Sequence, residues 1–273
     1  MNKFVKALLI VLIVALLGVF LYSGYQLTKT IHQYNEADRY YSTQSGKYAS
    51  FSETPQDSSP QNAVSRPGTP GQEQGDDAPA MLQEISPRIV DFKAMLQDNA
   101  DVRGWLYSPD TVIDYPVAQA KDNDYYLHRL LDRSYNPNGT LFIDYRCAGD
   151  FSGRHTVIYG HHMQNGSMLA SITEYKKQEY YDEHPVMYLN TPDGNYRLDV
   201  FSGFVTWYDS RIYLFDFIDD QEFEEWYTLM QSYSDFESQV ELSPTDRIVT
   251  LSTCTYEYDN ARYVLMAKLI PIG

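Results

Sequence analysis

The sequence has little positive charge and almost no cysteine. Its 273 residues carry 21 Lys and Arg against 37 Asp and Glu, and no basic cluster follows the first six positions. The formal net charge of -16 argues against binding to nucleic acid or to an anionic surface. There is no glycine-rich phosphate loop, no internal repeat, and no His-x-x-x-His or Cys-x-x-Cys spacing that would predict a metal site. We therefore expect neither a metal nor another cofactor.

The longest stretch without charge lies at the N-terminus. Two lysines precede an apolar run, 7–22, which with the residues before it approaches the roughly 20 residues that span a bilayer. A cleaved signal peptide is the alternative, but it needs a pattern of small residues that the next segment does not offer. The lysines favour a cytoplasmic N-terminus. We expect a cytoplasmic end at 1–6, a single transmembrane anchor at 7–24, and the rest outside the cell membrane.

An extracellular stalk and disordered linker is expected at 25–80. Residues 52–79 are rich in Ser, Pro, Gly, Gln and Asp, so they cannot bury enough apolar surface to offset the entropy lost on ordering. The composition predicts a spacer that holds the domain, 81–273, away from the membrane. Near the start of this domain we expect a helix with Ser86 as its N-cap and Pro87 at its first position.

The domain has the pattern of a mainly β protein. Short β-branched and aromatic runs are separated by turn signals such as Asn-Pro-Asn-Gly. Two helical stretches interrupt them, one after Met168 and one at 219–234, and their apolar stripes are typical of core-facing residues. This pattern favours a small closed barrel or a sandwich with helices on its periphery.

The two cysteines, Cys147 and Cys254, lie in the part expected outside the membrane, where disulfides form. A bridge between them is one interpretation, and it would suit a surface-anchored, non-catalytic β-domain whose many tyrosines serve an interface. In the other interpretation Cys254 is free. It ends one expected strand and Arg262 begins the next, so an antiparallel hairpin would place the two side chains near each other. A cation there favours the thiolate and could stabilise charge on a carbonyl oxygen.

A histidine pair, His161 and His162, follows a third strand-like run. The pKa of an unperturbed histidine lies near the working pH, so a histidine at a strand end is well placed for acid–base chemistry. Ordinary surface or packed histidines are the alternative. Cysteine, histidine and arginine at three strand ends form a set suited to nucleophilic catalysis. A papain-like protease is poorly supported, because its cysteine would precede the histidine and its fold is not mostly β.

These motifs resemble those of the sortases, the cysteine transpeptidases of Gram-positive cell surfaces. The sequence TLSTC at 250–254 matches the family's TLxTC nucleophile motif, YGHH at 159–162 matches its Gly-His segment, and Arg262 matches the arginine of the following strand. The resemblance is greatest to class B, through the serine two positions before the cysteine, the segment 122–129 and the helical insertion before the cysteine strand. It implies a closed eight-stranded β-barrel with N-terminal helices.

The resemblance also implies roles for individual residues. Cys254 would be the nucleophile that forms a thioacyl intermediate, His161 the general acid and base, and Arg262 the group that holds substrate and stabilises the oxyanion. Candidates for substrate binding are Leu127, Ser252, Thr253, Tyr208 and Ile212.

The same resemblance implies the partners. They are secreted proteins with a C-terminal Pro-x-Thr-type sorting motif and an amine of the peptidoglycan. A pilin-polymerising sortase, which would use a lysine amine of another protein, is the alternative within the family.

Overall fold

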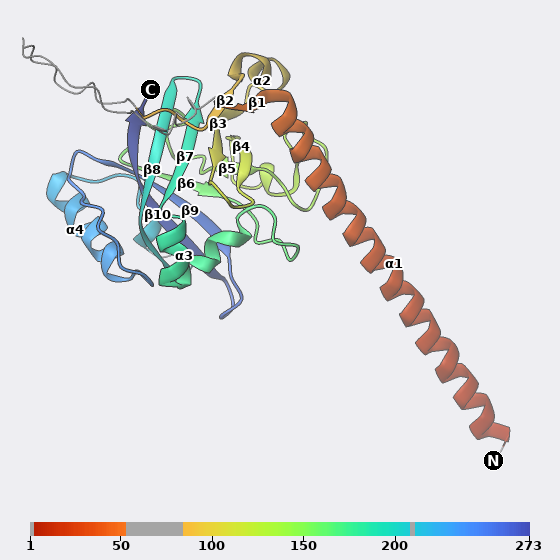
Figure 1. The fold of residues 1–273 in the computed structure, drawn as a ribbon. Helices are drawn as coiled ribbons and strands as arrows, with labels where there is room; N and C mark the ends of the chain where they lie inside the picture. The colour runs from red at the N-terminus through yellow and green to blue at the C-terminus, as the bar shows by residue number, and fades with distance from the viewer. Residues whose placement is uncertain (1–2, 53–83, 208–210) are drawn as a thin grey trace, which may run out of the picture.

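Eight strands of the chain close into a barrel. The structure, a computed structural model, describes residues 3–52, 84–207 and 211–273 (Figure 1). Around the barrel the strand order is β10, β8, β7, β3, β4, β5, β6, β9, with parallel pairing only in β4–β5 and β6–β9. The strands are β3 (Val102–Tyr107), β4 (Asp114–Ala118), β5 (Leu141–Ile143), β6 (His155–Tyr159), β7 (Val186–Thr191), β8 (Gly194–Trp207), β9 (Arg247–Cys254) and β10 (Ala261–Ile272). The predicted mainly β fold with a closed eight-stranded barrel is confirmed.

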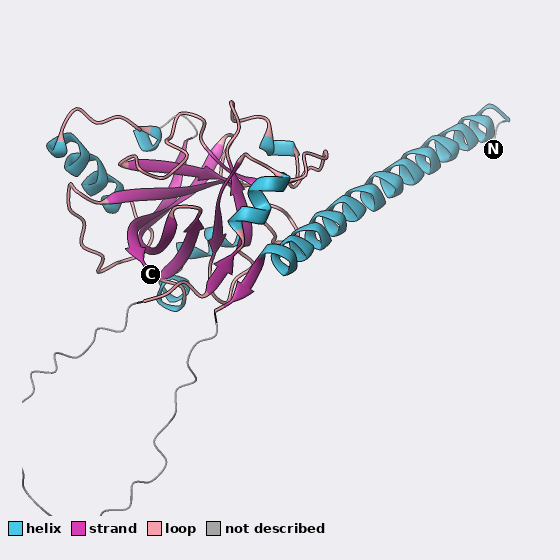
Figure 2. Ribbon diagram, turned by 90° about the horizontal axis from the view of Figure 1, so that it is seen from above, coloured by secondary structure: helices cyan, strands magenta, loops and turns pink. Residues whose placement is uncertain are grey.

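Strand β9 is covered on both faces. Val249 and Leu251 belong to the apolar cluster inside the barrel, whereas Ile248 packs in a second cluster under helix α4 (Asp220–Ser232). Alternate residues of a strand point to opposite faces, so the sequence of a strand that is covered on both faces is a nearly continuous apolar run. Figure 2 shows the helices at the periphery of the strands. The helical insertion predicted before the cysteine strand is therefore confirmed.

Two helical predictions differ from the structure in detail. The stretch after Met168 forms a 3-10 helix, η2 (Ala170–Lys176), followed by the short helix α3 (Gln178–Glu183). The helix expected to begin at Ser86 begins later, as α2 (Phe92–Asp98). Its N-cap is Asp91, whose carboxylate accepts a hydrogen bond from the Ala94 amide at 3.0 Å. The residues before it instead form strand β2 (Arg88–Val90), because a partner strand is available to pair with them.

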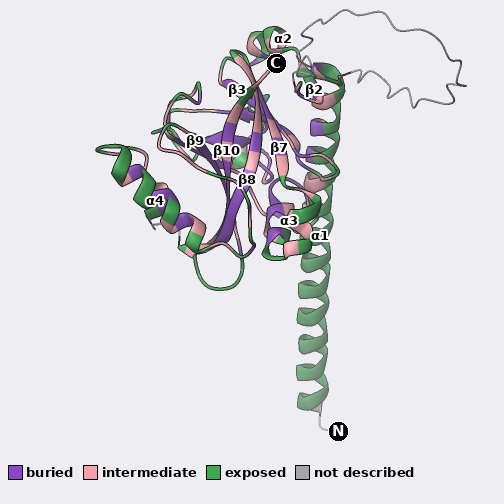
Figure 3. Cartoon of the chain, turned by 60° about the vertical axis from the view of Figure 1, so that its left-hand side comes forward, coloured by how far each residue is buried: buried purple, intermediate pink, exposed green. Residues whose placement is uncertain are grey.

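Helix α1 (Lys3–Tyr48) is the only described helix long and apolar enough to cross a membrane. An 18-residue window in it has a mean hydropathy of 3.0, and none of that window is buried against the protein. Figure 3 shows the long exposed part of α1 projecting from the barrel. These properties fit the predicted anchor by length and composition.

The C-terminal part of α1 belongs to the folded domain. Ala37, Tyr41 and Tyr48 are buried, and strand β1 (Ala49–Phe51), which follows directly, pairs with β2 in antiparallel register. Side chains of the expected stalk, N-terminal to the expected domain at 81–273, therefore pack on the barrel. Nearly all of the segment expected to be disordered, 52–79, falls within 53–83, which lies outside the described residues.

Candidate active site

The β9–β10 hairpin places Cys254 opposite Arg262. Cys254 is the last residue of β9, Arg262 is the second residue of β10, and the two are direct partners in the antiparallel register. The connecting loop is closed by a hydrogen bond from the Thr255 amide to the Ala261 carbonyl at 3.1 Å, and Asn260 adopts a positive φ of 62°. Asparagine tolerates this left-handed conformation better than most residues. The predicted hairpin is confirmed, and it results from contacts that are local in sequence.

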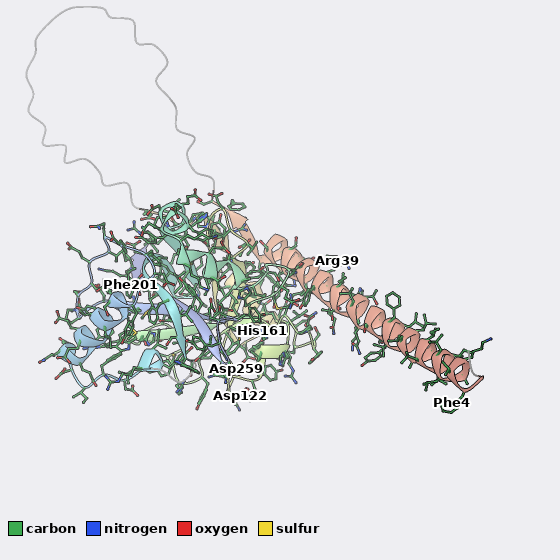
Figure 4. The ribbon with its side chains drawn as sticks, turned by 90° about the horizontal axis from the view of Figure 1, so that it is seen from below. Phe4, Arg39, Asp122, His161, Phe201 and Asp259 are labelled. Carbon is green, nitrogen blue, oxygen red and sulfur yellow. The ribbon has the colours of Figure 1, made fainter. Side chains whose placement is uncertain are left out.

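A cavity of about 220 Å³ opens beside this pair. It brings together six of the eight predicted site residues: Cys254, His161, Arg262, Leu127, Ser252 and Thr253. They come from β9, β10, the 3-10 helix η1 (Tyr126–His128) and the segment after β6. Figure 4 labels His161 on the side of the barrel where the loops that carry Asp122 and Asp259 also lie.

Ile212, which was predicted to bind substrate, does not line this cavity. It lies in the 3-10 helix η3 (Arg211–Tyr213), is 1% exposed, and packs under α4. It borders a larger cavity of about 520 Å³ between β8 and α4, which does not include Cys254. The next residue, Tyr213, lines the cysteine cavity instead. Tyr208 lies outside the described residues.

Both cysteines of the chain are unpaired. Cys147 is buried, and burial raises the pKa of its thiol to about 12, which makes it a poor nucleophile at neutral pH. Cys254 is partly exposed and borders the cavity. The structure therefore does not contain the Cys147–Cys254 disulfide of the non-catalytic interpretation.

His161 has one ring nitrogen committed to the backbone. Its Nε2 lies 2.7 Å from the carbonyl oxygen of Leu127. A carbonyl can only accept, so Nε2 carries a hydrogen, and in the neutral ring Nδ1 is the nitrogen with a free lone pair. Burial, more than any other cause, lowers the pKa of His161, and the neighbouring His128 and Arg262 lower it further, while the Leu127 carbonyl opposes them. The imidazole is therefore neutral at physiological pH and can take up a proton at Nδ1.

His128 stacks on His161. The ring centroids are 5.6 Å apart and the planes differ by 20°, whereas the His128 side chain remains exposed to solvent. The sequence showed no signal for this contact, because the two residues are 33 positions apart, His128 at the end of η1 and His161 after β6.

His162 has a different position from His161. Its Nδ1 lies 3.0 Å from the backbone carbonyl of Cys254, to which it donates, and its ring makes an edge contact with Tyr256. His162 is not among the residues that line the cavity. Its side chain therefore holds the end of β9 and does not face the cavity.

The Arg262 guanidinium has no ion-pair partner in the described part of the chain. Its Nη1 donates to the Ala261 carbonyl at 3.0 Å, and none of the ion pairs within residues 3–52, 84–207 and 211–273 includes it. Within the described residues, its positive charge borders the cavity without an ion-pair partner. A fork of N–H donors beside a thiol can bind a developing oxyanion.

Ser252 and Thr253 link the cysteine strand to its surroundings. The Ser252 hydroxyl lies 3.0 Å from the Tyr213 hydroxyl, and the Thr253 hydroxyl donates to the Gly160 carbonyl at 2.7 Å. Both residues are almost fully buried, although they border the cavity. The hydroxyl of Thr253 is thus already used to join β9 to the segment that carries His161.

Five lining residues were not among the predicted site residues: Asn123, Phe142, Tyr159, Gly160 and Tyr213. A fully buried carboxylate, Asp144, accepts hydrogen bonds from Asn123 at 3.0 Å and from the Tyr159 hydroxyl at 2.9 Å. Burial opposes its ionisation, but the bonds from Arg146, Tyr159 and Asn123 outweigh burial and lower the pKa of Asp144. Tyr159 directly precedes Gly160 in the YGHH motif, and Asn123 lies in the segment 122–129, so the sequence offered a signal for both.

Comparison with known proteins gives consistent matches. The family model described as the sortase domain matches residues 106–270. Sortase B of Listeria monocytogenes is 35% identical over 189 residues, which cover 68% of this chain and 76% of the relative. Sortase B of Staphylococcus aureus is 32% identical over 184 residues, which cover 67% of this chain and 75% of the relative.

Solved structures show the same relationship. A Staphylococcus aureus sortase B–substrate complex superposes with a TM-score of 0.64 at 32% identity and covers 67% of this chain and 85% of its own. A Bacillus anthracis protein described as similar to sortase B has a TM-score of 0.62 at 38% identity and covers 66% of this chain and 82% of its own.

Proposed function

This chain belongs to the sortase family and to its class B, the members of which are cysteine transpeptidases, and we propose that it attaches secreted proteins to the cell wall through a thioacyl intermediate at Cys254. The observation that carries the proposal is the single cavity shared by Cys254, His161 and Arg262. The proposed substrate is a C-terminal Pro-x-Thr-type sorting motif, and the proposed acceptor is an amine of the peptidoglycan.

In the first half of the reaction, Nδ1 of His161 takes the proton of the Cys254 thiol as Sγ attacks the carbonyl that follows the motif's threonine. The S–C bond forms and the carbonyl oxygen becomes an oxyanion, which the positive charge of Arg262 beside the cavity stabilises. The amide C–N bond then breaks, and His161 gives its proton to the departing amine. In the second half, the acceptor amine attacks the thioester, His161 removes its extra proton, and Cys254 leaves with that proton.

The Leu127 carbonyl supports both roles of His161. It accepts from Nε2–H in the neutral ring and in the imidazolium, so the ring keeps its orientation while the proton moves on and off Nδ1. Burial keeps the resting ring neutral. The depressed pKa also makes the imidazolium a stronger acid toward the leaving amine.

The proposed location is the cell membrane. Residues 7–24 of α1 would cross the bilayer once with 1–6 in the cytoplasm, and the domain would lie outside. The apolar, unburied window of α1 supports this arrangement. Secreted substrates and peptidoglycan are both available on that side.

The test uses the full chain in detergent micelles, mixed with a panel of Pro-x-Thr peptides. Intact-mass spectrometry should detect one thioacyl adduct, and an amine-bearing peptidoglycan peptide should release it as an amide product. Cys254→Ala should give no adduct, whereas the matched variant Cys147→Ala should keep it, because the Cys147 thiol is buried. An adduct that persists in Cys254→Ala would contradict the assigned nucleophile. A preference for a lysine amine of a protein over the peptidoglycan amine would favour the pilin-polymerising alternative.

A further inference from the structure

The last turns of α1 pack against two loops that hold His161. Ala37 is 0% exposed and Tyr41 is 4% exposed, and both belong to the apolar cluster of the barrel. The Tyr41 ring makes an edge contact with the Tyr115 ring of β4, at a centroid distance of 5.2 Å. This part of α1 is therefore fixed to the barrel through a buried aromatic side chain.

The first of these loops is reached through the Tyr41 hydroxyl. That hydroxyl donates to the Gly139 carbonyl and lies 3.0 Å from the hydroxyl of Thr140. The Thr140 amide in turn donates to the Tyr126 carbonyl at 3.0 Å. Tyr126 begins η1, and the next residue, Leu127, accepts the hydrogen of His161 Nε2. A chain of three hydrogen bonds and one peptide link thus connects α1 to the catalytic imidazole.

Gly139 makes this junction tight. Its φ is +61°, and a Cβ there would lie 2.5 Å from the Tyr126 carbonyl oxygen. A residue with a side chain would therefore push η1 away from α1. The close approach leaves η1 little freedom to move independently of Tyr41.

The second loop follows His161 in the chain. The Leu169 amide donates to the His161 carbonyl at 3.0 Å, and the Met168 amide donates to the Tyr115 hydroxyl at 3.2 Å. At the outer edge of this loop, Asn165 donates to the Asp38 carboxylate of α1 at 3.0 Å. The backbone of His161 is therefore supported by the same helix that supports its hydrogen-bond partner.

We propose that the C-terminal turns of α1, residues 33–48, are part of the catalytic scaffold and position His161 through these two loops. The inference rests on the proposed role of His161 as acid and base. Tyr41 and Asp38 act as positioning residues, since neither lines the cavity. The helix that carries the proposed membrane anchor thereby sets the orientation of the imidazole, and a domain cut at the start of β2 would lack that support.

The experiment compares two tyrosine-to-phenylalanine changes in the full chain. Tyr41→Phe removes the hydroxyl that reaches the first loop and keeps the packed ring. Tyr175→Phe is the matched control, since Tyr175 is 1% exposed and its hydroxyl also donates to a backbone carbonyl, that of His184 at 2.6 Å. Both changes remove a buried hydroxyl that donates to a backbone carbonyl, and Tyr41→Phe also removes the contact with the Thr140 hydroxyl, so both should lower the unfolding temperature.

If Tyr41 positions His161, the two variants should differ in their kinetics. We expect Tyr41→Phe to lower kcat about tenfold with KM nearly unchanged, and to move the acidic limb of the kcat–pH profile, whereas Tyr175→Phe should keep both. Asp38→Ala, an exposed change that does not threaten folding, should lower kcat in the same direction by about twofold. Equal kcat values and equal pH profiles in the two tyrosine variants would overturn the proposal.

An NMR measurement without substrate tests the positioning role independently of the proposed function. The imidazole nitrogen signals of His161, read by NMR on histidine-labelled protein, should shift in Tyr41→Phe and stay in place in Tyr175→Phe. If they do so while the wild type turns over no peptide, the proposed function fails and the positioning role stands. Unshifted signals in Tyr41→Phe overturn the positioning role whatever the activity.

Discussion

Replacing Arg262 by alanine should abolish most of the transpeptidase activity while leaving the fold intact. The guanidinium lies on β10 opposite Cys254, borders the cavity, and has no ion-pair partner among the described residues. Its removal therefore breaks no salt bridge within that part of the chain. The unfolding temperature should stay close to that of the wild type.

The magnitude follows from the charge that Arg262 places beside the oxyanion. A unit positive charge about 4 Å from a unit negative charge contributes about 4 kcal/mol at an effective dielectric constant near 20. Loss of one oxyanion donor typically lowers kcat by about 10²- to 10³-fold. We expect a loss of that size in kcat/KM for Arg262→Ala. Arg262→Lys should show a smaller loss of about tenfold, since lysine keeps the charge and lacks the planar fork of donors.

The assay is the rate of thioacyl formation with a fluorogenic sorting peptide under single-turnover conditions. The matched control is Arg247→Ala, at the opposite end of β9, where the guanidinium donates to the Phe151 carbonyl at 2.9 Å. That variant should keep its activity and lose only stability. A rate for Arg262→Ala within about tenfold of the wild type, or an equal loss in Arg247→Ala, would refute the oxyanion role.

Two further predictions concern histidines. His161→Ala should lower kcat at least about 10²-fold, because it removes the acid and base. His162→Ala should lower kcat only about tenfold, because it removes one hydrogen bond to the Cys254 carbonyl. The reverse order in steady-state kinetics would mean that the roles of the two histidines are exchanged. His155 is buried between the Leu214 carbonyl and the Thr250 hydroxyl, and burial lowers its pKa from 6.5 to about 4. As the pH falls, the unfolded state therefore takes up this proton at a higher pH than the folded state does. The free energy of unfolding should decrease by about 3 kcal/mol between pH 6.5 and about 4. Urea titrations at several pH values should show this loss in the wild type and a smaller one in His155→Gln; equal pH slopes would contradict it.

The parts of the site that are local in sequence could be predicted. Cys254 and Arg262 are separated by one short loop, so the strand pattern alone determined that they face each other. The TLSTC and YGHH segments also indicated which residue types converge. The mainly β architecture could be predicted, because alternating and apolar runs separated by turn signals are compatible with few folds other than a barrel or a sandwich.

Contacts between distant segments could not be predicted in this way. The carbonyl of Leu127, which orients His161, is a backbone atom and leaves no mark in the sequence. Ile212 and Tyr213 are adjacent apolar residues, and only the direction of η3 decides which one faces the cavity and which packs under α4. The strand that follows α1, β1, pairs with β2, and this register joins residues 41 positions apart, Ala49 with Val90.

The pairing of β1 with β2 bears on the role of the segment that joins them, 53–83. Phe51 pairs with Arg88, and the Arg88 guanidinium lies 3.8 Å from the centre of the Phe51 ring and forms an ion pair with Asp114 of β4. The chain on both sides of 53–83 is thus attached to the barrel, and lengthening or shortening that segment would not move the active site relative to the membrane.

With the proposed anchor at 7–24, the distance of the domain from the bilayer would be set by α1 instead. From residue 24, where the proposed anchor ends, to Ala37, the first buried residue of α1, the helix is unbroken and rises about 20 Å at 1.5 Å per residue. This part of α1 would thus hold the active site at a fixed distance from the bilayer. A sorting motif could then be cleaved only where it passes at that distance.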